Sequence, residues 1–315
     1  MRRWLFALLL FLALAAAAGG ESWALSPGLL GQGRTPYPQV FLRTAQHWLL
    51  YTYPAGPFLL GGSVVAPVRP VAELLGATVE WSRGTVTVSR GAGRVRFAVG
   101  RAEGEVNGVR EAWPLAPRLL PRYNTVLAPL EPMLRAFGFS ARLAKTPGGA
   151  YLLRLGGESL ERVDAFIRER LYWWDVGLIA DRMAGGEADN LVPTAFELNP
   201  LRPLPPEAAW ARLPLAEEPL YARSVVTFRE TQGRGLEPGA WGIYLAEGTG
   251  ANVKHIGLTP TALPDGTTTQ HPCPASGAAV LPGRAVACRF EAWRYAGTPA
   301  EQPVRRVVVR IIRYK

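Results

Sequence analysis

The chain has 315 residues, of which 48% are hydrophobic and 19% charged, and its formal net charge is +10. This composition is that of a globular chain long enough for roughly two or three domains, and it excludes a disordered protein. The basic excess is almost entirely arginine, since Lys145, Lys254 and Lys315 are the only lysines. A positive surface attracts anionic polymers weakly and without specificity, so the charge alone defines no fold.

The first residues have the pattern of a secretory signal peptide. Met1–Arg3 is a charged start, and Trp4–Ala18 is an apolar run too short to span a bilayer comfortably. Cleavage sites are expected after Ala18 or Ala24, and no cysteine lies there to carry a lipid. The alternative is a retained N-terminal anchor helix. We expect an exported protein in the periplasm, at the cell surface or outside the cell, with no nucleic-acid partner.

Export decides how the two cysteines, Cys273 and Cys288, are interpreted. An even number of cysteines in an exported protein most simply forms a disulfide, so we predict a bond between them. His271 lies close to Cys273, but two candidate ligands are too few for a metal site. We therefore predict no metal and no other cofactor.

The stretch Ser63–Trp81 returns in altered form at Thr125–Leu143. Each copy has the pattern of a short strand, a helix with proline near its start, a glycine and another strand. Apolar residues at i, i+3, i+4 and i+7 predict one buried face on each helix. These faces consist of Val68, Val71, Ala72 and Leu75 in the first copy and Leu130, Met133, Leu134 and Phe137 in the second. The glycines at the expected left-handed C-caps are Gly76 and Gly138.

Charged residues lie on the outer side of both predicted helices. Arg69 and Glu73 are four residues apart, and Glu131 and Arg135 occupy the matching positions of the second copy with the signs exchanged. Residues at this spacing are neighbours on a helix, so each pair is expected to form an exposed ion pair. The repeat therefore offers structural charges rather than groups suited to catalysis.

Short strands are predicted on both sides of the first helix. Gln39–Leu42 and Trp48–Tyr51 lead into it, and a meander that includes Thr85–Val88 and Val95–Val99 follows it. Asn107–Gly108 is the strongest hairpin signal in the chain. We expect the strands of this meander to pair antiparallel.

Residues 65–81 read Val-Ala-Pro-Val-Arg-Pro-Val-Ala-Glu-Leu-Leu-Gly-Ala-Thr-Val-Glu-Trp, with Val-Asn-Gly downstream at 106–108. This pattern resembles the copper amine oxidase N-terminal-like domain, also called the stalk domain. The resemblance covers roughly residues 40 to 155 and implies a small antiparallel sheet packed on a helix. The family occurs in exported bacterial proteins, commonly as tandem copies fused to unrelated domains. The second copy departs from it at Glu131, Arg135 and Leu143, where arginine, glutamate and an aromatic residue are usual.

The family name refers to copper, and the sequence can be compared with that chemistry. In true amine oxidases, histidines of a large catalytic domain hold the copper beside a quinone derived from tyrosine. Here the three histidines are His47, His255 and His271, no two of them in a His-x-His spacing, and the chain has no Asn-Tyr dipeptide. We expect neither copper binding nor amine oxidation.

Beyond the repeats, the apolar periodicity predicts one amphipathic helix from Glu158 to Met183, ended by the glycines at 185 and 186. Tyr172–Trp174 lie within this pattern, and we interpret them as packing on a neighbouring domain rather than as a ligand platform. The prolines between Leu191 and Leu220 predict a linker or wrapping segment without regular structure.

From residue 221 onward, apolar residues alternate in runs that predict strands separated by turns rich in Gly and Pro. A compact antiparallel β-sandwich is the expected arrangement. The runs are Ser224–Phe228, Trp241–Leu245, Val286–Ala292 and Val307–Ile311.

Three carboxylates on or beside these strands are the candidates for a catalytic role. A glycosidase would need two of Glu230, Glu247 and Glu291 to face each other across a cleft. The chain has no Gly-x-Ser-x-Gly elbow, no His-Glu-x-x-His helix and no Walker-type loop. We expect no catalysis, and the alternative is a secreted hydrolase with its active site in the C-terminal half.

Glu291, Trp293 and Tyr295 alternate along one predicted strand, on the face opposite to Phe290 and Ala292. Two aromatic side chains beside a carboxylate can stack on sugar rings, so these three residues are the candidate ligand-binding face. The alternative is that they pack beneath the long helix. We predict a module that binds an envelope polysaccharide or an envelope protein.

The sequence thus predicts an α+β protein with tandem small antiparallel sheet-plus-helix units, a long connecting helix and an antiparallel β-sandwich-like C-terminal domain. The expected divisions are a signal peptide at 1–24, lead-in strands at 25–57, the repeats at 58–155, the amphipathic helix at 156–186, the linker at 187–220 and the C-terminal β domain at 221–315.

Overall fold

The structure is a computed structural model of the whole chain. It describes residues 36–170, 172–173, 191–198, 202–203, 219–237, 241–248, 279–295 and 306–313. The predicted signal peptide and Cys273 lie outside these residues, so both stay predictions. The described part combines antiparallel sheets with a few short helices, which confirms the α+β class. No helix within it is long and apolar enough to cross a membrane.

Each copy of the repeated stretch folds as a strand, a helix and a strand. The first copy consists of β4 (Ser63–Pro67), α3 (Val68–Leu74) and β5 (Thr78–Ser82), and the second of β11 (Thr125–Pro129), α4 (Glu131–Ala136) and β12 (Ser140–Lys145). The predicted apolar helix faces are confirmed, because every one of their residues is less than 9% exposed. Gly76 and Gly138 adopt positive φ angles of 78° and 75°, as their predicted capping role requires.

The two copies meet through their first strands. β4 and β11 pair antiparallel at the centre of a four-stranded sheet, with β3 (Phe58–Leu60) and β10 (Arg118–Leu120) on the outside. Ala66 lies directly opposite Ala128, and these residues occupy the same position in their copies. The pairing therefore relates the copies by an approximate two-fold rotation.

The outer charges of the two helices differ in what they contact. Arg69 and Glu73 form the predicted exposed ion pair, at 3.4 Å. The matching pair on α4 was predicted wrongly, because Arg135 pairs with Glu111 instead. Glu131 Oε1 accepts a hydrogen bond of 2.8 Å from the backbone N–H of Val64. A hydrogen bond from a half-buried amide to a carboxylate stabilises the fold more than an exposed pair of long side chains. Glu131 therefore bonds to Val64 instead of pairing with Arg135.

The first copy continues into a five-stranded antiparallel meander. Asn107 and Gly108 have φ angles of 51° and 84°, which confirms the predicted hairpin with both central residues left-handed. The strands follow each other in chain order as β5, β6 (Thr85–Arg90), β7 (Gly93–Ala98), β8 (Glu103–Val106) and β9 (Val109–Ala112).

The second copy continues into a seven-stranded sheet that also contains strands from both halves of the chain. The order is β12, β13 (Tyr151–Gly156), β1 (Val40–Arg43), β2 (Trp48–Thr52), β20 (Arg306–Arg313), β18 (Trp241–Gly248) and β14 (Tyr172–Trp173). β1 pairs parallel to β13, and β2 pairs antiparallel to β20. The predicted N-terminal strands are confirmed, but β18 and β20 join them in one sheet instead of belonging to a separate C-terminal unit.

A further sheet holds β15 (Leu191–Leu198), β17 (Pro219–Glu230), β16 (Arg202–Pro203) and β19 (Ala285–Tyr295), with β17 paired to the other three. The prediction that 191–220 lacks regular structure is wrong for Leu191–Leu198. Pro193 is tolerated there because β15 lies at the sheet edge and its register shifts between Pro193 and Ala195.

The helix α5 (Leu160–Arg170) is shorter than the predicted Glu158–Met183. Val163 and Ile167 are buried, as the periodicity requires. Tyr172 and Trp173 form β14 and pair with Glu247 and Ala246 instead of continuing the helix. Ladder hydrogen bonds at the edge of an existing sheet therefore replace the helical continuation that the local pattern favoured.

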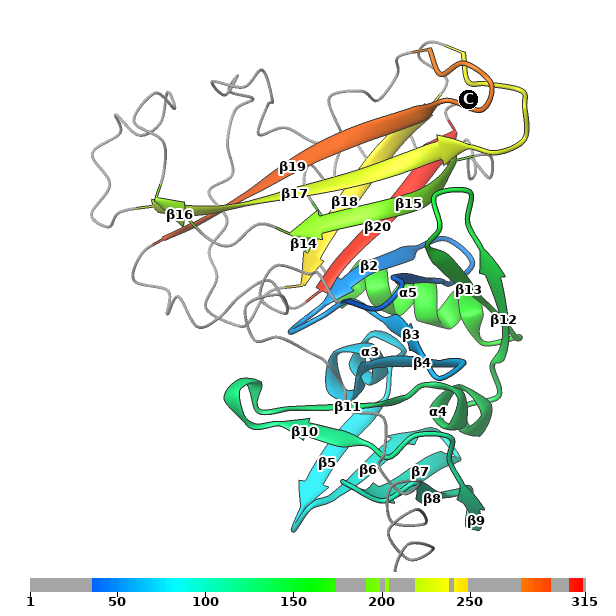
Figure 1. Cartoon of the computed structure of the whole chain (residues 1–315), viewed down its shortest axis with the longest axis vertical. Coiled ribbons are helices and arrows are strands. Elements are labelled where there is room, and N and C mark those ends of the chain that lie inside the picture. The colour runs from blue at the N-terminus through cyan, green and yellow to red at the C-terminus, as the bar shows by residue number, and fades with distance from the viewer. Residues whose placement is uncertain are drawn as a thin grey trace, which may run out of the picture.

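One core connects the two copies with the large sheet. A single cluster of buried residues includes Leu75 of the first copy, Phe137 of the second, Ile167 of α5 and Val308 of β20. In Figure 1 the meander occupies the lower end of the molecule, α3 and α4 lie in the middle, and β17 and β19 lie at the upper end. The repeated helices thus lie between the meander and the C-terminal strands.

The contact between Glu131 and Val64 predicts unequal roles for two matching helix positions. Replacing Glu131 by Ala leaves the Val64 amide without its acceptor, so the free energy of unfolding should fall by about 1–3 kcal/mol. Replacing Arg69, its counterpart on α3, by Ala should change it by no more than about 0.5 kcal/mol, because that ion pair is exposed. Urea denaturation of both variants measures this difference, and equal effects would contradict the assignment.

Candidate functional site

A hollow of about 350 Å³ lies where the two copies meet beside the meander. It is lined by the start of α3, by β5 and β6, and by the segment from Leu119 to Val126 of the second copy. That segment contains the short helix η1 (Pro121–Tyr123), which ends at Asn124 in a left-handed conformation. The volume of the hollow is at the lower end of the range for small-molecule sites, roughly 300–1,000 Å³.

Aromatic side chains contribute much of this wall. Trp81 lines the hollow and is 46% exposed, although most tryptophans in folded proteins are largely buried. Val79 shares its face of β5, because residues two apart on a strand point the same way. Tyr53 and Tyr123 line the same hollow, with their rings edge to face at 5.7 Å. Flat, partly exposed rings are typical of ligand-binding surfaces.

Arg69 is the one charged residue in the lining, which includes no Asp or Glu. Its side chain is half exposed, and its contact with Glu73 is that of an exposed pair. The hollow therefore combines aromatic surface with a positive charge. Its lining includes no Asp, Glu or His, the side chains that most often act as general acids or bases.

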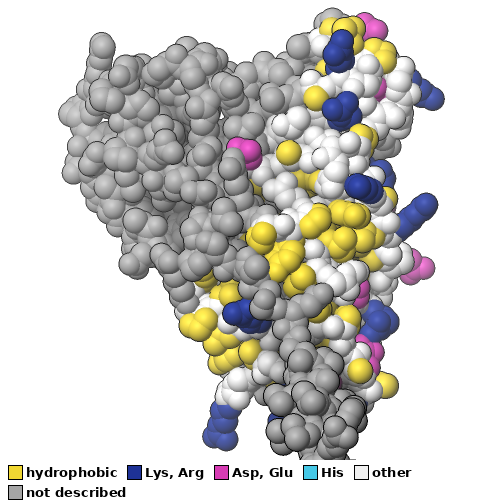
Figure 2. All heavy atoms as spheres, in the orientation of Figure 1, with side chains coloured by type: hydrophobic (Ala, Val, Ile, Leu, Met, Phe, Trp, Pro, Cys, Tyr) yellow, Lys and Arg dark blue, Asp and Glu magenta, His cyan; other side chains and the backbone are white. Residues whose placement is uncertain are grey.

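Figure 2 shows the surface in one view, with hydrophobic side chains in patches and Lys and Arg side chains projecting along the margins. The described part exposes few large apolar residues. They are Trp81, Val109, Leu143 and Leu281. Trp81 and Leu143 occupy the same position in the two copies, but only Trp81 lines the hollow.

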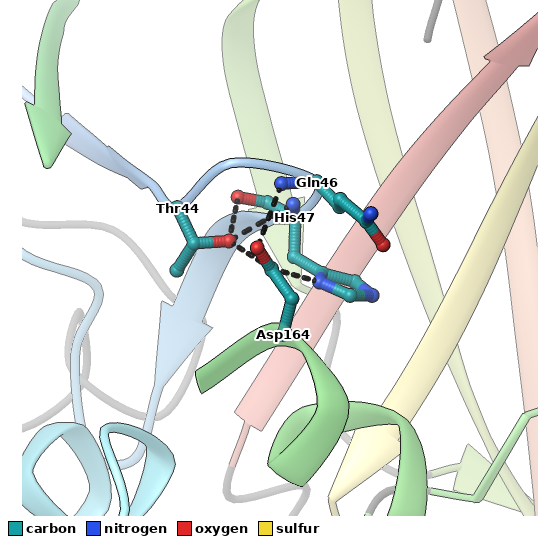
Figure 3. A network of polar contacts seen from close by, with 4 residues as sticks. All are labelled: Thr44, Gln46, His47 and Asp164. Carbon is teal, nitrogen blue, oxygen red and sulfur yellow. Dashed lines mark hydrogen bonds and ion pairs between the residues drawn. The ribbon is translucent and has the colours of Figure 1, made fainter. Parts of the chain in front are cut away.

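A buried polar network connects the turn between β1 and β2 to α5 (Figure 3). His47 Nδ1 lies 2.5 Å from Asp164 Oδ1, and the Thr44 hydroxyl donates to the same oxygen. The backbone N–H of Gln46 donates to Asp164 Oδ2 at 3.2 Å, and that of His47 donates to Thr44 Oγ1 at 3.0 Å. Every polar group around this carboxylate therefore comes from one tight turn.

The network has the residue types of a catalytic triad, but its burial argues for a structural role. The side chains of His47 and Asp164 are each 1% exposed, so no substrate reaches them. Removing one partner of a buried hydrogen bond typically destabilises a protein by about 1–3 kcal/mol, because the other partner is left buried without it. The interaction fastens α5 to the large sheet.

Glu230, one of the carboxylates that a secreted hydrolase would need, is 1% exposed at the end of β17. Its Oε1 accepts from the N–H groups of Gln232 and Arg234, and its Oε2 accepts from those of Gly233 and Gly283. Burial raises the pKa of Glu230, but these amide hydrogen bonds lower it further, so the pKa lies below the ordinary value. Glu230 holds two loops together and is not placed for catalysis.

The predicted ligand-binding face lies on β19, which confirms the strand but not the face. Glu291, Trp293 and Tyr295 pair with Arg223, Tyr221 and Pro219 of β17. Their side chains lie outside what the structure describes, so the predicted stacking surface stays a prediction. The same holds for the carboxylate of Glu247 on β18 and for the thiol of Cys288 on β19.

The copper amine oxidase N-terminal domain is the family whose model matches this chain, over residues 50–146. This match supports the resemblance seen in the repeated stretch, and it concerns an N-terminal domain rather than a catalytic one. No curated protein and no solved structure matches the chain. The matched residues include every lining position of the hollow, from Tyr53 to Val126.

Copper does not fit the matched segment. Residues 50–146 contain no histidine and no cysteine, the side chains that most often bind copper in proteins. No three His, Cys, Asp or Glu side chains come together as a metal site within the described part of the chain. No step of the protein's chemistry is therefore assigned to copper.

The sequence did not predict the hollow or the network of His47. Thr44 and His47 contact Asp164 across more than a hundred positions, which no local pattern encodes. Trp81 gave a usable signal, because it is a large aromatic residue next to a turn on an otherwise polar strand. Its partners Tyr53 and Tyr123 gave none.

The role of Glu230 predicts a pH-dependent loss of stability when it is replaced. A group with a lowered pKa stabilises the fold above its unfolded pKa, about 4.3 for glutamate, and loses this effect as pH falls through the folded pKa. Glu230→Gln should lower the free energy of unfolding at pH 7 by at least about 1.5–3 kcal/mol, the range for one hydrogen bond to a charged group. The deficit should shrink below about pH 4.

The exposed Glu237 of the same loop is the matched control, and Glu237→Gln should have little effect at any pH. Urea denaturation between acidic and neutral pH measures both variants. A deficit of Glu230→Gln that stays constant across this range would contradict the ionised, amide-bonded carboxylate.

Proposed function

We propose that the protein is an exported, non-catalytic cell-envelope protein that binds an envelope polysaccharide or envelope protein. The predicted signal peptide at 1–24 supports export to the periplasm, the cell surface or the exterior. The family match at 50–146 supports a stalk-like rather than a catalytic N-terminal region. The net positive charge adds a weak attraction to anionic polymers.

The observation that carries this proposal is the contrast between the described ionisable groups and the open hollow. His47, Asp164 and Glu230 are buried in hydrogen bonds that fasten secondary structure. The hollow presents exposed aromatic surface and one arginine instead. A protein that uses its buried acids for stability and exposes aromatic rings is suited to binding.

We also propose that 58–155 is a tandem duplication of the stalk-like unit, the second copy being the degenerate one. Two observations support it: the equal order of strand, helix and strand, and the pairing of Ala66 with Ala128. The C-terminal strands β17 and β19 are proposed to form a sandwich-like arrangement with the large sheet and to carry the ligand-binding face, with the Cys273–Cys288 disulfide as a brace.

The proposed binding role predicts retention of the mature protein on isolated cell envelope. Replacing Trp293 and Tyr295 together by Ala should reduce retention by at least about tenfold, because aromatic anchors dominate such contacts. Leu281→Ala is the control, since Leu281 is 64% exposed and lies outside this face. Sedimentation with the envelope fraction, followed by quantification of bound protein, is the measurement.

Unchanged retention of the double variant, with its circular dichroism intact, would contradict the proposed face. Salt should weaken the retention of the unaltered protein, because charges at an exposed surface are screened. Release of soluble fragments from the envelope, abolished by Glu291→Gln, would instead support the secreted hydrolase.

A further inference from the structure

The two-fold pairing of β4 with β11 creates two equivalent corners, each where one strand passes the start of the opposite helix. At the first corner Val64 of β4 lies beside Glu131, the first residue of α4, and Leu130, which precedes it. At the second corner their counterparts are Val126 of β11 and Val68 and Arg69 of α3. The helix position carries Arg69 at one corner and Glu131 at the other, so the two corners differ in side-chain charge.

The first corner is closed by contacts within the protein. The N–H of Leu130 donates to the carbonyl of Val64 at 2.8 Å. Glu131 Oε1 accepts from the N–H of Val64, also at 2.8 Å. A carboxylate therefore sits at this corner, held by a backbone amide.

The second corner is part of the hollow. Val68, Arg69 and Val126 all line it. A guanidinium group donates hydrogen bonds but accepts none, so Arg69 cannot cap the amide of Val126 as Glu131 caps that of Val64. This corner thus combines a positive charge with the position that holds a carboxylate in its twin.

Aromatic surface flanks the open corner. Trp81 presents a half-exposed indole in the same hollow, and Tyr53 and Tyr123 line it as well. The apolar faces of sugar rings pack against such rings, and their hydroxyl groups can pair with the neighbouring polar residue Asn124. A ligand with a flat carbohydrate ring and a carboxylate matches both parts of the site.

We propose that this hollow binds an acidic polysaccharide, with a uronic-acid carboxylate at Arg69 and its sugar ring on Trp81. The ligand's carboxylate takes the place that Glu131 takes at the closed corner. This inference rests on the proposed binding role, but it assigns the ligand to the repeat region and not to β19. Charge complementarity supports it, since the lining has one arginine and no acid.

The sharpest test replaces Arg69 by Glu, which puts a carboxylate at the open corner as Glu131 does at the closed one. Affinity for short oligomers of galacturonic acid, measured by calorimetry, should fall at least about tenfold. Arg69→Glu also replaces the exposed ion pair with Glu73 by two carboxylates at the same spacing, so a circular dichroism spectrum like that of the parent protein is the control for folding. Arg142→Glu, on the exposed strand β12, makes the same charge change outside the hollow and should keep the affinity within about twofold.

Trp81→Ala tests the stacking part of the site. It should also weaken binding of the acidic oligomers at least about tenfold. Leu143→Ala removes the exposed apolar residue at the same position of the second copy and should leave binding unchanged. Neutral oligomers of glucose should bind the unaltered protein at least about tenfold more weakly than the acidic ones.

Equal losses for Arg69→Glu and Arg142→Glu, or for Trp81→Ala and Leu143→Ala, would overturn the assignment of the hollow. Equal affinity for neutral and acidic oligomers would overturn the claim that the ligand carries a carboxylate. Binding of an acidic peptide instead of either sugar would overturn the claim that the ligand is a carbohydrate. Envelope retention separates this inference from the proposed function. Retention without oligomer binding removes the inference alone, whereas oligomer binding at Trp81 without retention removes the envelope role alone.

Discussion

The antiparallel pairing of β4 with β11 is the constraint on which the rest of the described fold depends. Because Ala66 faces Ala128, the helices that follow these strands leave in opposite directions. α3 and α4 then bury their apolar faces in one common core, whose residues also come from the meander and from the large sheet. A shift of this register by one residue would turn alternate side chains to the other face of the sheet and separate the helices from that core.

The second constraint is the insertion of the chain's outer segments into the sheet of the second copy. β1 lies beside β13, and β2 lies beside β20, so strands from both halves of the chain share one ladder. The network of His47 and Asp164 fastens the turn between β1 and β2 to α5, which follows β13 directly. Stability of the repeat region and of the C-terminal strands is therefore coupled through shared hydrogen bonds and not through a flexible linker.

Local patterns predicted the elements whose formation depends on neighbouring residues. The helix faces, the glycine caps and the Asn107–Gly108 hairpin follow from spacing and backbone preference alone. Sheet partners do not, because β1 and β13 are far apart in sequence and any exposed edge satisfies a strand's hydrogen bonds. For the same reason Tyr172 and Trp173 were assigned to a helix, and Leu191–Leu198 to a linker. The hollow was missed because it needs both copies at once.

The differences between the copies follow from the same geometry. The two corners occupy matching positions of the copies, and at one of them the Glu131 carboxylate accepts a backbone hydrogen bond. Within the described part of the chain, Arg69, at the matching position, makes no hydrogen bond to a backbone group of its own corner and forms only an exposed pair with Glu73. On a helix surface alone, either order of the two charges allows an exposed ion pair at this spacing. The two orders differ in the folded protein, because Glu131 accepts a hydrogen bond from a strand amide of the other copy, whereas Arg69 lines the hollow. An exchange of side-chain charge therefore distinguishes a corner held by an internal hydrogen bond from one that lines the hollow.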